Sequence, residues 1–172
     1  MSGSRGMRGL EPWRWLGVPM LQALAATVLF GIPLRAFGLQ LPEPVFPMVL
    51  AFAWAVIRPS ILAPFAILVL GLLLDIFWGG PLGLWALCLL IAYGVAFTGR
   101  SMMAGQNRLI LWAWYALATA IAMGAGYLFV MLDSRASPGL VPMAWQFLAT
   151  IVLYPFAQRL IDLFEDADVR FR

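Results

Sequence analysis

The chain of 172 residues has no histidine and no lysine, and its single cysteine, Cys88, lies within an apolar run. All eleven basic residues are arginine, and charged residues make up only 11% of the chain. These absences exclude disulfide frameworks, thiolate metal sites of the usual kinds and catalysis by histidine. The arginines are dispersed and form no basic stripe with interleaved aromatic residues, so nucleic acid is not an expected partner. We expect no metal and no cofactor.

Hydrophobic residues, by contrast, make up 63% of the chain. Soluble domains carry roughly one quarter charged residues, so this composition indicates a membrane protein. Spans of about 20 apolar residues each would use most of the chain. The sequence therefore predicts an all-α membrane protein, a compact bundle embedded in the lipid bilayer, without a separate soluble domain.

Apolar runs bounded by charged residues, glycines and prolines predict six spans. The second run has 14 residues, fewer than the ~20 that a crossing needs, so it recruits flanking residues, lies where the bilayer is thin, or is re-entrant. Arg58 and Pro59 close it, because the residue before a proline disfavours helix. The first run is longer than the apolar core of a cleaved signal, which has about 7 to 15 residues, and is expected to stay as a helix. The expected organisation is a tail over 1–15, spans at about 16–39, 44–57, 61–78, 82–98, 109–132 and 140–160, and a tail over 161–172.

The distribution of arginines predicts the orientation of these spans. If the N-terminus is cytoplasmic, nine of the eleven arginines fall on cytoplasmic segments, and Arg35 and Arg135 fall outside. This is the bias that the positive-inside rule describes. A re-entrant second run would place the C-terminal arginines outside and weaken the bias. Six spans with both termini in the cytoplasm are therefore favoured.

Small residues at four-residue spacing predict where helices approach closely, since membrane helices associate through backbone proximity and side-chain fit. The fifth span has two such rows, so we expect it to lie centrally and to contact neighbours on two sides. The rows are Ala116, Ala120, Gly124 and Ala118, Ala122, Gly126 in the fifth span, and Ala23, Thr27, Gly31 in the first.

The stretch "GLLLDIFWGGPLG", residues 71–83, sets an aspartate in apolar sequence one turn before the outer end of the third span. A carboxylate at a helix C-terminus faces the negative end of the helix dipole, so Asp75 needs compensation. Gly79 and Gly80 can adopt the positive φ angles that end one helix, and Pro81 suits the first position of the next. Such a turn would direct free N–H groups at the carboxylate.

Arg35 is a second candidate partner, and it would reach Asp75 if the first and third spans pack together. We hypothesise that Asp75 pins the hairpin of the third and fourth spans, and through Arg35 also the first span. Two other interpretations stay open: a solvated aspartate without a special role, and a substrate or proton site. The last is disfavoured because no second ionisable group lies near the middle of the membrane.

The same residues resemble a known family, the rod-shape-determining protein MreD of bacteria. The similarity runs through "PEPVFPMVLAFAWAVIRP" (42–59) and "GLLLDIFWGGPLGLWALCLLIAYGVA" (71–96), with a weaker echo in "LYPFAQRLIDLF". The tail departs from the family, whose tails tend to be basic, because it reads "DLFEDADVRFR". The positions that match the family pattern are Arg58, Pro59, Gly71, Asp75, Gly83 and Tyr93.

The resemblance implies a multi-pass subunit of the cell-elongation machinery in the bacterial inner membrane. Its implied direct partner is MreC, and through the complex it would meet the MreB filament and the peptidoglycan synthases. The residues themselves favour a non-catalytic protein, because the chain has no nucleophile–base arrangement and no phosphate loop. We therefore expect a scaffold rather than an enzyme.

An alternative function is a small transporter, or the substrate-capturing subunit of an energy-coupled uptake system. Such a protein should direct polar groups into a cavity. The polar residues predicted within the membrane are Gln22, Arg35, Asp75, Thr119 and Gln146.

Overall fold

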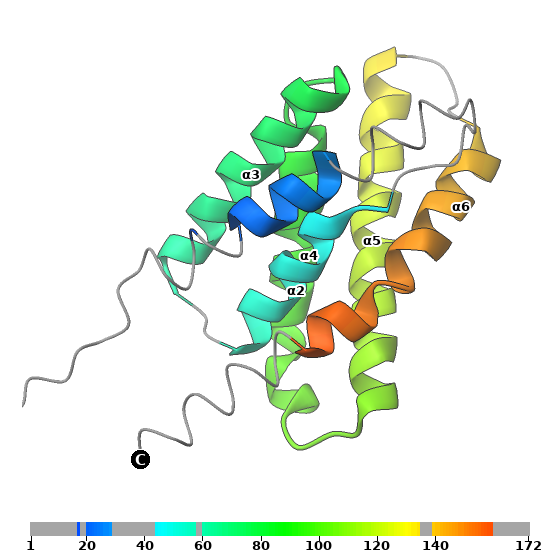
Figure 1. The fold of residues 1–172 in the computed structure, drawn as a ribbon. Helices are drawn as coiled ribbons and strands as arrows, with labels where there is room; N and C mark the ends of the chain where they lie inside the picture. The colour runs from blue at the N-terminus through cyan, green and yellow to red at the C-terminus, as the bar shows by residue number, and fades with distance from the viewer. Residues whose placement is uncertain (1–16, 18–19, 29–43, 58–59, 135–138, 160–172) are drawn as a thin grey trace, which may run out of the picture.

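The computed structural model describes residues 17, 20–28, 44–57, 60–134 and 139–159, and in these ranges every regular element is a helix. The chain is also helical over residues 20–28, and again over 154–159 after a turn at residues 152–153. Figure 1 shows the helices as one bundle, with α3 and α6 on opposite sides of α2, α4 and α5. The labelled helices are α2 (Phe46–Ile57), α3 (Leu62–Trp78), α4 (Leu84–Met103), α5 (Arg108–Ser134) and α6 (Leu140–Ile151).

Three helices are long and apolar enough to cross a membrane: Leu84–Met103, Arg108–Asp133, and Leu140–Arg159 taken across the turn. α2 and α3 are shorter apolar helices. Each of the six predicted runs contains helix, although most of the first predicted span lies outside the described residues. The tails predicted over 1–15 and 161–172 also lie outside them.

α2 is the most deeply buried helix of the bundle. Its 12 residues measure about 18 Å along the axis, well short of the ~30 Å hydrocarbon core. Every residue from Pro47 to Ala55 is buried, because α2 packs against α3, α4 and α5. The second predicted run, which is too short for a full crossing, therefore forms a helix that is surrounded by other helices rather than by lipid.

The prediction for the fifth span holds only in part. α5 contacts neighbours on two sides, α4 and α6, as the small residues predict, but the centre of the described bundle is formed by α2 and α4. In one row, Gly126 approaches α4 so closely that an added Cβ would lie 2.6 Å from Cys88 Sγ. The prediction that the row Ala116, Ala120, Gly124 packs against a neighbour is wrong. Ala120 is exposed, and a Cβ on Gly124 would meet nothing within 4 Å. In the first span Ala23 and Thr27 are buried, whereas Gly31 lies outside the described residues.

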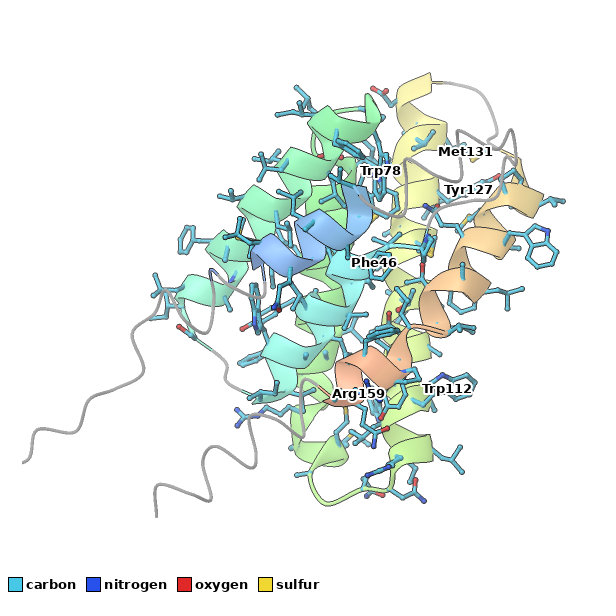
Figure 2. The ribbon with its side chains drawn as sticks, in the orientation of Figure 1. Phe46, Trp78, Trp112, Tyr127, Met131 and Arg159 are labelled. Carbon is cyan, nitrogen blue, oxygen red and sulfur yellow. The ribbon has the colours of Figure 1, made fainter. Side chains whose placement is uncertain are left out.

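α4 continues five residues beyond its predicted end at Thr98. Its last turn contains the exposed Arg100, a cation at the negative end of the helix dipole, which stabilises the extension. Asn107 then starts α5, since its Oδ1 accepts the Ile110 N–H at 2.9 Å. This loop lies at the same end of the bundle as Arg159 (Figures 1 and 2). The other eight arginines on which the predicted orientation depends lie outside the described residues, so the orientation stays a prediction.

Candidate functional site

Asp75 joins the end of α3 to the start of α4. The side chain is 1% exposed, and its two oxygens accept different backbone groups: Oδ2 the Gly83 N–H and Oδ1 the Trp85 N–H, both at 2.8 Å. The first N–H groups of a helix have no partner within the helix, and they lie at the positive end of its dipole. A buried carboxylate from α3 therefore caps α4, whose own N-cap residue, Gly83, has no side chain to do so.

The backbone of Asp75 closes the other side of the same turn. Its carbonyl oxygen accepts the N–H of Gly79 at 3.0 Å and that of Gly80 at 3.3 Å. Gly79 has φ 67° and Gly83 has φ 95°, both in the left-handed region that L residues with a Cβ rarely adopt. The turn can follow this path only because glycine stands at both places.

The geometry confirms the prediction that the turn supplies donors to Asp75, and it corrects two details. Gly83, rather than Gly80, is the second glycine with positive φ. α4 begins at Leu84, so Pro81 lies in the turn and is not the first helical residue; its carbonyl accepts the Leu84 N–H at 3.2 Å. The expectation that Pro81 starts the helix is wrong because the capped N–H groups belong to residues 83 and 85.

Gly71, one turn before Asp75 on the same face of α3, sets the distance between the two helices. A Cβ at this position would lie 2.3 Å from the Ala86 Cα and 2.5 Å from its backbone nitrogen. Backbone atoms cannot give way as flexible side chains do, so only glycine permits this approach. These roles explain why a glycine stands four residues before the aspartate in "GLLLD": Gly71 brings α4 close, and Asp75 caps it.

Aromatic residues pair at two places in this hairpin, one at the turn and one further along α4. Trp78 and Trp85 lie against each other across the turn, with ring centroids 4.8 Å apart (Figure 2 labels Trp78). Further along α4, Tyr93 is 8% exposed and stacks on Phe97 at 6.1 Å. Among the positions that match the MreD pattern, Gly71, Asp75 and Gly83 thus meet in one place, whereas Tyr93 packs elsewhere on α4. Arg35, Arg58 and Pro59 lie outside the described residues, and so does the hypothesised ion pair of Arg35 with Asp75.

The sequence analysis missed a second buried polar cluster, centred on Thr150 near the end of α6. Its Oγ1 donates to the Gln146 carbonyl at 2.7 Å and accepts the Val45 N–H at 3.2 Å, just before α2. The Thr150 carbonyl accepts the buried Tyr115 hydroxyl of α5 at 3.1 Å. One threonine thereby ties α6 to α5 and to the start of α2. A threonine in an apolar run gives no sequence signal for such a role, because two of its three partners, Val45 and Tyr115, are distant in the chain.

Chemically, the Asp75 site can hold two helices in a fixed relation. Both carboxylate oxygens already accept hydrogen bonds, and a charged acceptor satisfied by backbone donors is a stable arrangement. In the part of the chain that the structure describes, no three His, Cys, Asp or Glu residues gather where they could hold a metal ion.

Comparison of the chain with models of protein families, with characterised proteins and with solved structures gave no match.

Proposed function

We propose that this protein is a non-catalytic scaffold of the bacterial cell-elongation machinery, similar to MreD. It would cross the inner membrane six times with both termini in the cytoplasm. MreC would be its direct partner, and the MreB filament and the peptidoglycan synthases would join through the larger complex. The observation that carries the proposal is the Asp75 cap, which uses the residues of the family-type pattern, Gly71, Asp75 and Gly83, to build a rigid helical hairpin.

The arrangement of polar groups supports a scaffold. Among the described residues, the buried polar or charged side chains are Thr27, Asp75, Thr119 and Thr150. Thr27 and Thr150 bond carbonyls of their own helices, and Asp75 is engaged as described above. Thr27, Asp75 and Thr150 thus serve the bundle itself, and among these four only the Thr119 hydroxyl has no hydrogen-bond partner. A transport site needs several polar groups that converge on a cavity and are free to meet a substrate.

Large apolar side chains cover two outer faces, one on α3 and one on α6, on opposite sides of the bundle (Figures 1 and 2). Ile76 on α3 is 70% exposed and Val152 after α6 is 71% exposed. Faces of this kind suit contact with lipid or with the spanning helix of a partner, neither of which requires catalytic groups. Two separate faces would let one protein organise more than one neighbour.

The described cavities fit a substrate-capturing subunit less well. A small pocket between α4, α5 and α6, beside Cys88 and Gln146, has about 150 Å³, below the roughly 300 to 1,000 Å³ of ligand sites. A larger groove beside α2 is apolar along most of its length and has polar side chains, Gln22 and Arg159, at one end only, whereas a site for a water-soluble substrate needs polar groups around the ligand.

The experiment that tests the proposal is depletion of the protein in its own bacterium, with cell width followed by microscopy over several generations. We expect the rods to widen and round as elongation fails. Unchanged rods, or a defect cured by one added nutrient, would overturn the proposal and favour the transporter. A plasmid copy carrying Gly94→Ala should restore rods, because a Cβ on Gly94 meets nothing within 4 Å.

A second readout addresses the partner directly. The full-length protein, tagged and solubilised in mild detergent, should retain MreC. If MreC is absent from the complex while the protein remains folded, the assigned partner is wrong even where cell shape depends on the chain.

A further inference from the structure

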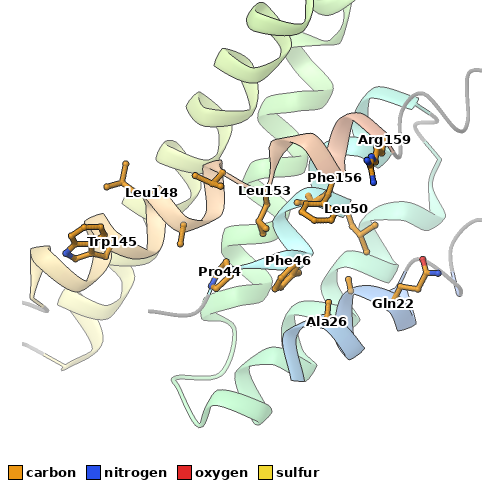
Figure 3. A pocket seen from close by; sticks show the side chains of 14 residues that line it. Gln22, Ala26, Pro44, Phe46, Leu50, Trp145, Leu148, Leu153, Phe156 and Arg159 are labelled. Atoms are coloured by element: carbon orange, nitrogen blue, oxygen red, sulfur yellow. The ribbon is translucent and has the colours of Figure 1, made fainter. Parts of the chain in front are cut away.

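An apolar groove of about 820 Å³ runs between the helical segment 20–28, α2 and the C-terminal part of the described chain (Figure 3). Phe46 and Leu50 of α2 form its floor, and Leu148 and Phe156 form the wall on the α6 side. Phe156 is 57% exposed and Leu148 46% exposed, so the groove opens to the surroundings of the bundle. It is separate from the Asp75 site, which lies at the turn between α3 and α4.

The two ends of the groove differ in chemistry. Arg159 and Gln22 lie at one end, and Trp145 lies at the other (Figure 3). Arg159 is exposed and lies at the same end of the bundle as the turn between α4 and α5 (Figure 2). The long side chain of an arginine at the end of a span can extend to the lipid headgroups. Between Trp145 and Arg159 the chain turns at residues 152–153, so two helical segments line this side of the groove. The groove thus has one cationic end and is otherwise apolar.

The lining of the groove favours a lipid chain over a protein helix. Close helix packing in membranes relies on rows of small residues at four-residue spacing. The small residues of the lining, Ala23, Ala26 and Ala149, form no such row, and most of the groove is lined by bulky side chains such as Phe46, Leu50 and Phe156. A flexible acyl chain needs no such row.

We propose that this groove binds one anionic phospholipid, with an acyl chain along Phe46 and Leu148 and the headgroup phosphate at Arg159. The guanidinium group supplies two parallel N–H donors that match phosphate oxygens, and the Gln22 carboxamide adds a donor at the same end. A zwitterionic lipid has the same phosphate but also an amine that Arg159 repels, so the groove discriminates by net headgroup charge. This inference does not depend on the proposed scaffold function.

The test is native mass spectrometry of the full-length protein released from detergent after incubation with equal amounts of phosphatidylglycerol and phosphatidylethanolamine that carry the same acyl chains. We expect one phosphatidylglycerol to be retained about fivefold more than phosphatidylethanolamine, the factor typical of one basic residue near an anionic headgroup. Arg159→Gln should bring the two lipids to parity. Arg108→Gln is the matched control, since it removes an arginine at the same end of the bundle, outside the groove lining.

A second pair of variants separates the apolar groove from the charge. Ala149→Trp fills the lining beside Leu148 and should lower retention of both lipids, whereas Ala113→Trp, on an exposed position of α5, should not. Equal retention of the two lipids by the native chain, or unchanged selectivity in Arg159→Gln, would overturn the proposal. So would lipid that stays bound while Ala149→Trp releases a protein partner, because the occupant would then be a helix.

The acidic tail, which lies outside the described residues, is the alternative occupant of the cationic end that the next experiment tests. If phosphatidylglycerol binds only after Asp162→Asn and Glu165→Gln are introduced together, the tail occupies the cationic end in the native protein, and the lipid assignment is wrong. Retention that is the same with and without these two changes supports it.

Discussion

The α3–α4 hairpin and the α6 side of the bundle achieve stability in different ways. In the hairpin, backbone meets backbone at Gly71, and a buried charge is satisfied within the turn. Among the labelled helices, α6 contacts mainly α5. In the span Leu140–Arg159, of which α6 is the first part, 22% of the most apolar stretch is buried, compared with 44% in α4. The hairpin therefore satisfies its close contacts and its buried charge within itself, although α3, like α6, also presents large apolar side chains to other neighbours.

The polar contacts show the same contrast. Asp75 gains two charge-assisted bonds at 2.8 Å, both to backbone N–H groups of the next helix. Near the end of α6, Thr150 makes neutral bonds, and Trp112 Nε1 reaches the Ile151 carbonyl only at 3.4 Å. Charged hydrogen bonds are roughly twice as strong as neutral ones. The comparison thus predicts that substitutions in the hairpin cost stability, and that substitutions on α6 affect interactions with neighbours.

The largest effect is expected from Asp75→Ala. It removes both caps and leaves the Gly83 and Trp85 N–H groups buried without partners, which should lower the free energy of unfolding by about 3 kcal/mol. This loss of stability is measured by unfolding the purified protein in mixed micelles with increasing amounts of sodium dodecyl sulfate. Asp75→Asn keeps one acceptor oxygen, which can cap one of the two N–H groups, so this variant should lose about half as much free energy of unfolding as Asp75→Ala.

The exchange of Asp75→Arg with Arg35→Asp sharpens this prediction. Arginine has no acceptor, so it cannot cap α4, and the double variant should remain as unstable as Asp75→Arg alone. Recovery of native stability in the double variant would show that the ion pair with Arg35, and not the cap, is the main contribution of Asp75.

The next largest effect is expected from Gly71→Ala, which places a methyl group against the Ala86 backbone and forces the helices apart. Overpacking of this kind should cost about 2 kcal/mol in the same unfolding measurement. Gly94→Ala in α4 is the control: an added Cβ has open space there, so the free energy of unfolding should stay level or rise by up to about 1 kcal/mol. Equal losses in the two variants would mean that helix propensity, and not the close approach, decides the result.

Thr150→Val should cost about 1 kcal/mol, because the Val45 N–H loses its acceptor while the shape of the side chain is kept. Thr98→Val is the matched control, since the exposed Thr98 hydroxyl bonds only carbonyls of its own helix. A loss in Thr150→Val as large as that in Asp75→Ala would break the comparison between the two regions.

Leu148→Ala should have the smallest effect on folding, within about 0.5 kcal/mol, because the side chain is 46% exposed. If the α6 side serves a partner or a lipid, the same variant should weaken that contact in co-purification or lipid retention. If Leu148→Ala lowers the free energy of unfolding but leaves these contacts unchanged, the α6 side contributes to stability rather than to interactions with neighbours, and the comparison is wrong.

The amino-acid sequence predicts the helices and one of the two polar clusters. Apolar runs place most helix ends within a few residues, because membrane burial of the backbone demands helix wherever a run is long enough. Asp75 could be interpreted because its partners lie within ten residues along the chain. The Thr150 cluster could not, because Val45 is 105 residues away.

The remaining errors have physical causes of their own. Pro81 suits a first helical turn as well as a loop, and the position of the cap on residues 83 and 85 decides between them. The exposed Ala120 shows that four-residue spacing identifies rows able to pack but does not tell which row has a neighbour. Burial of α2 depends on helices made later in the chain, and no local pattern reports it.

The short, enclosed α2 has a consequence for how the protein is made. A segment of 12 residues, about 18 Å long, cannot enter the bilayer stably by itself as it leaves the ribosome. The surfaces that enclose it belong to α3, α4 and α5, all synthesised afterwards. We therefore expect α2 to wait beside the insertion machinery and to reach its place only when α4 has followed α3 into the membrane, so that biogenesis of this protein is concerted rather than helix by helix.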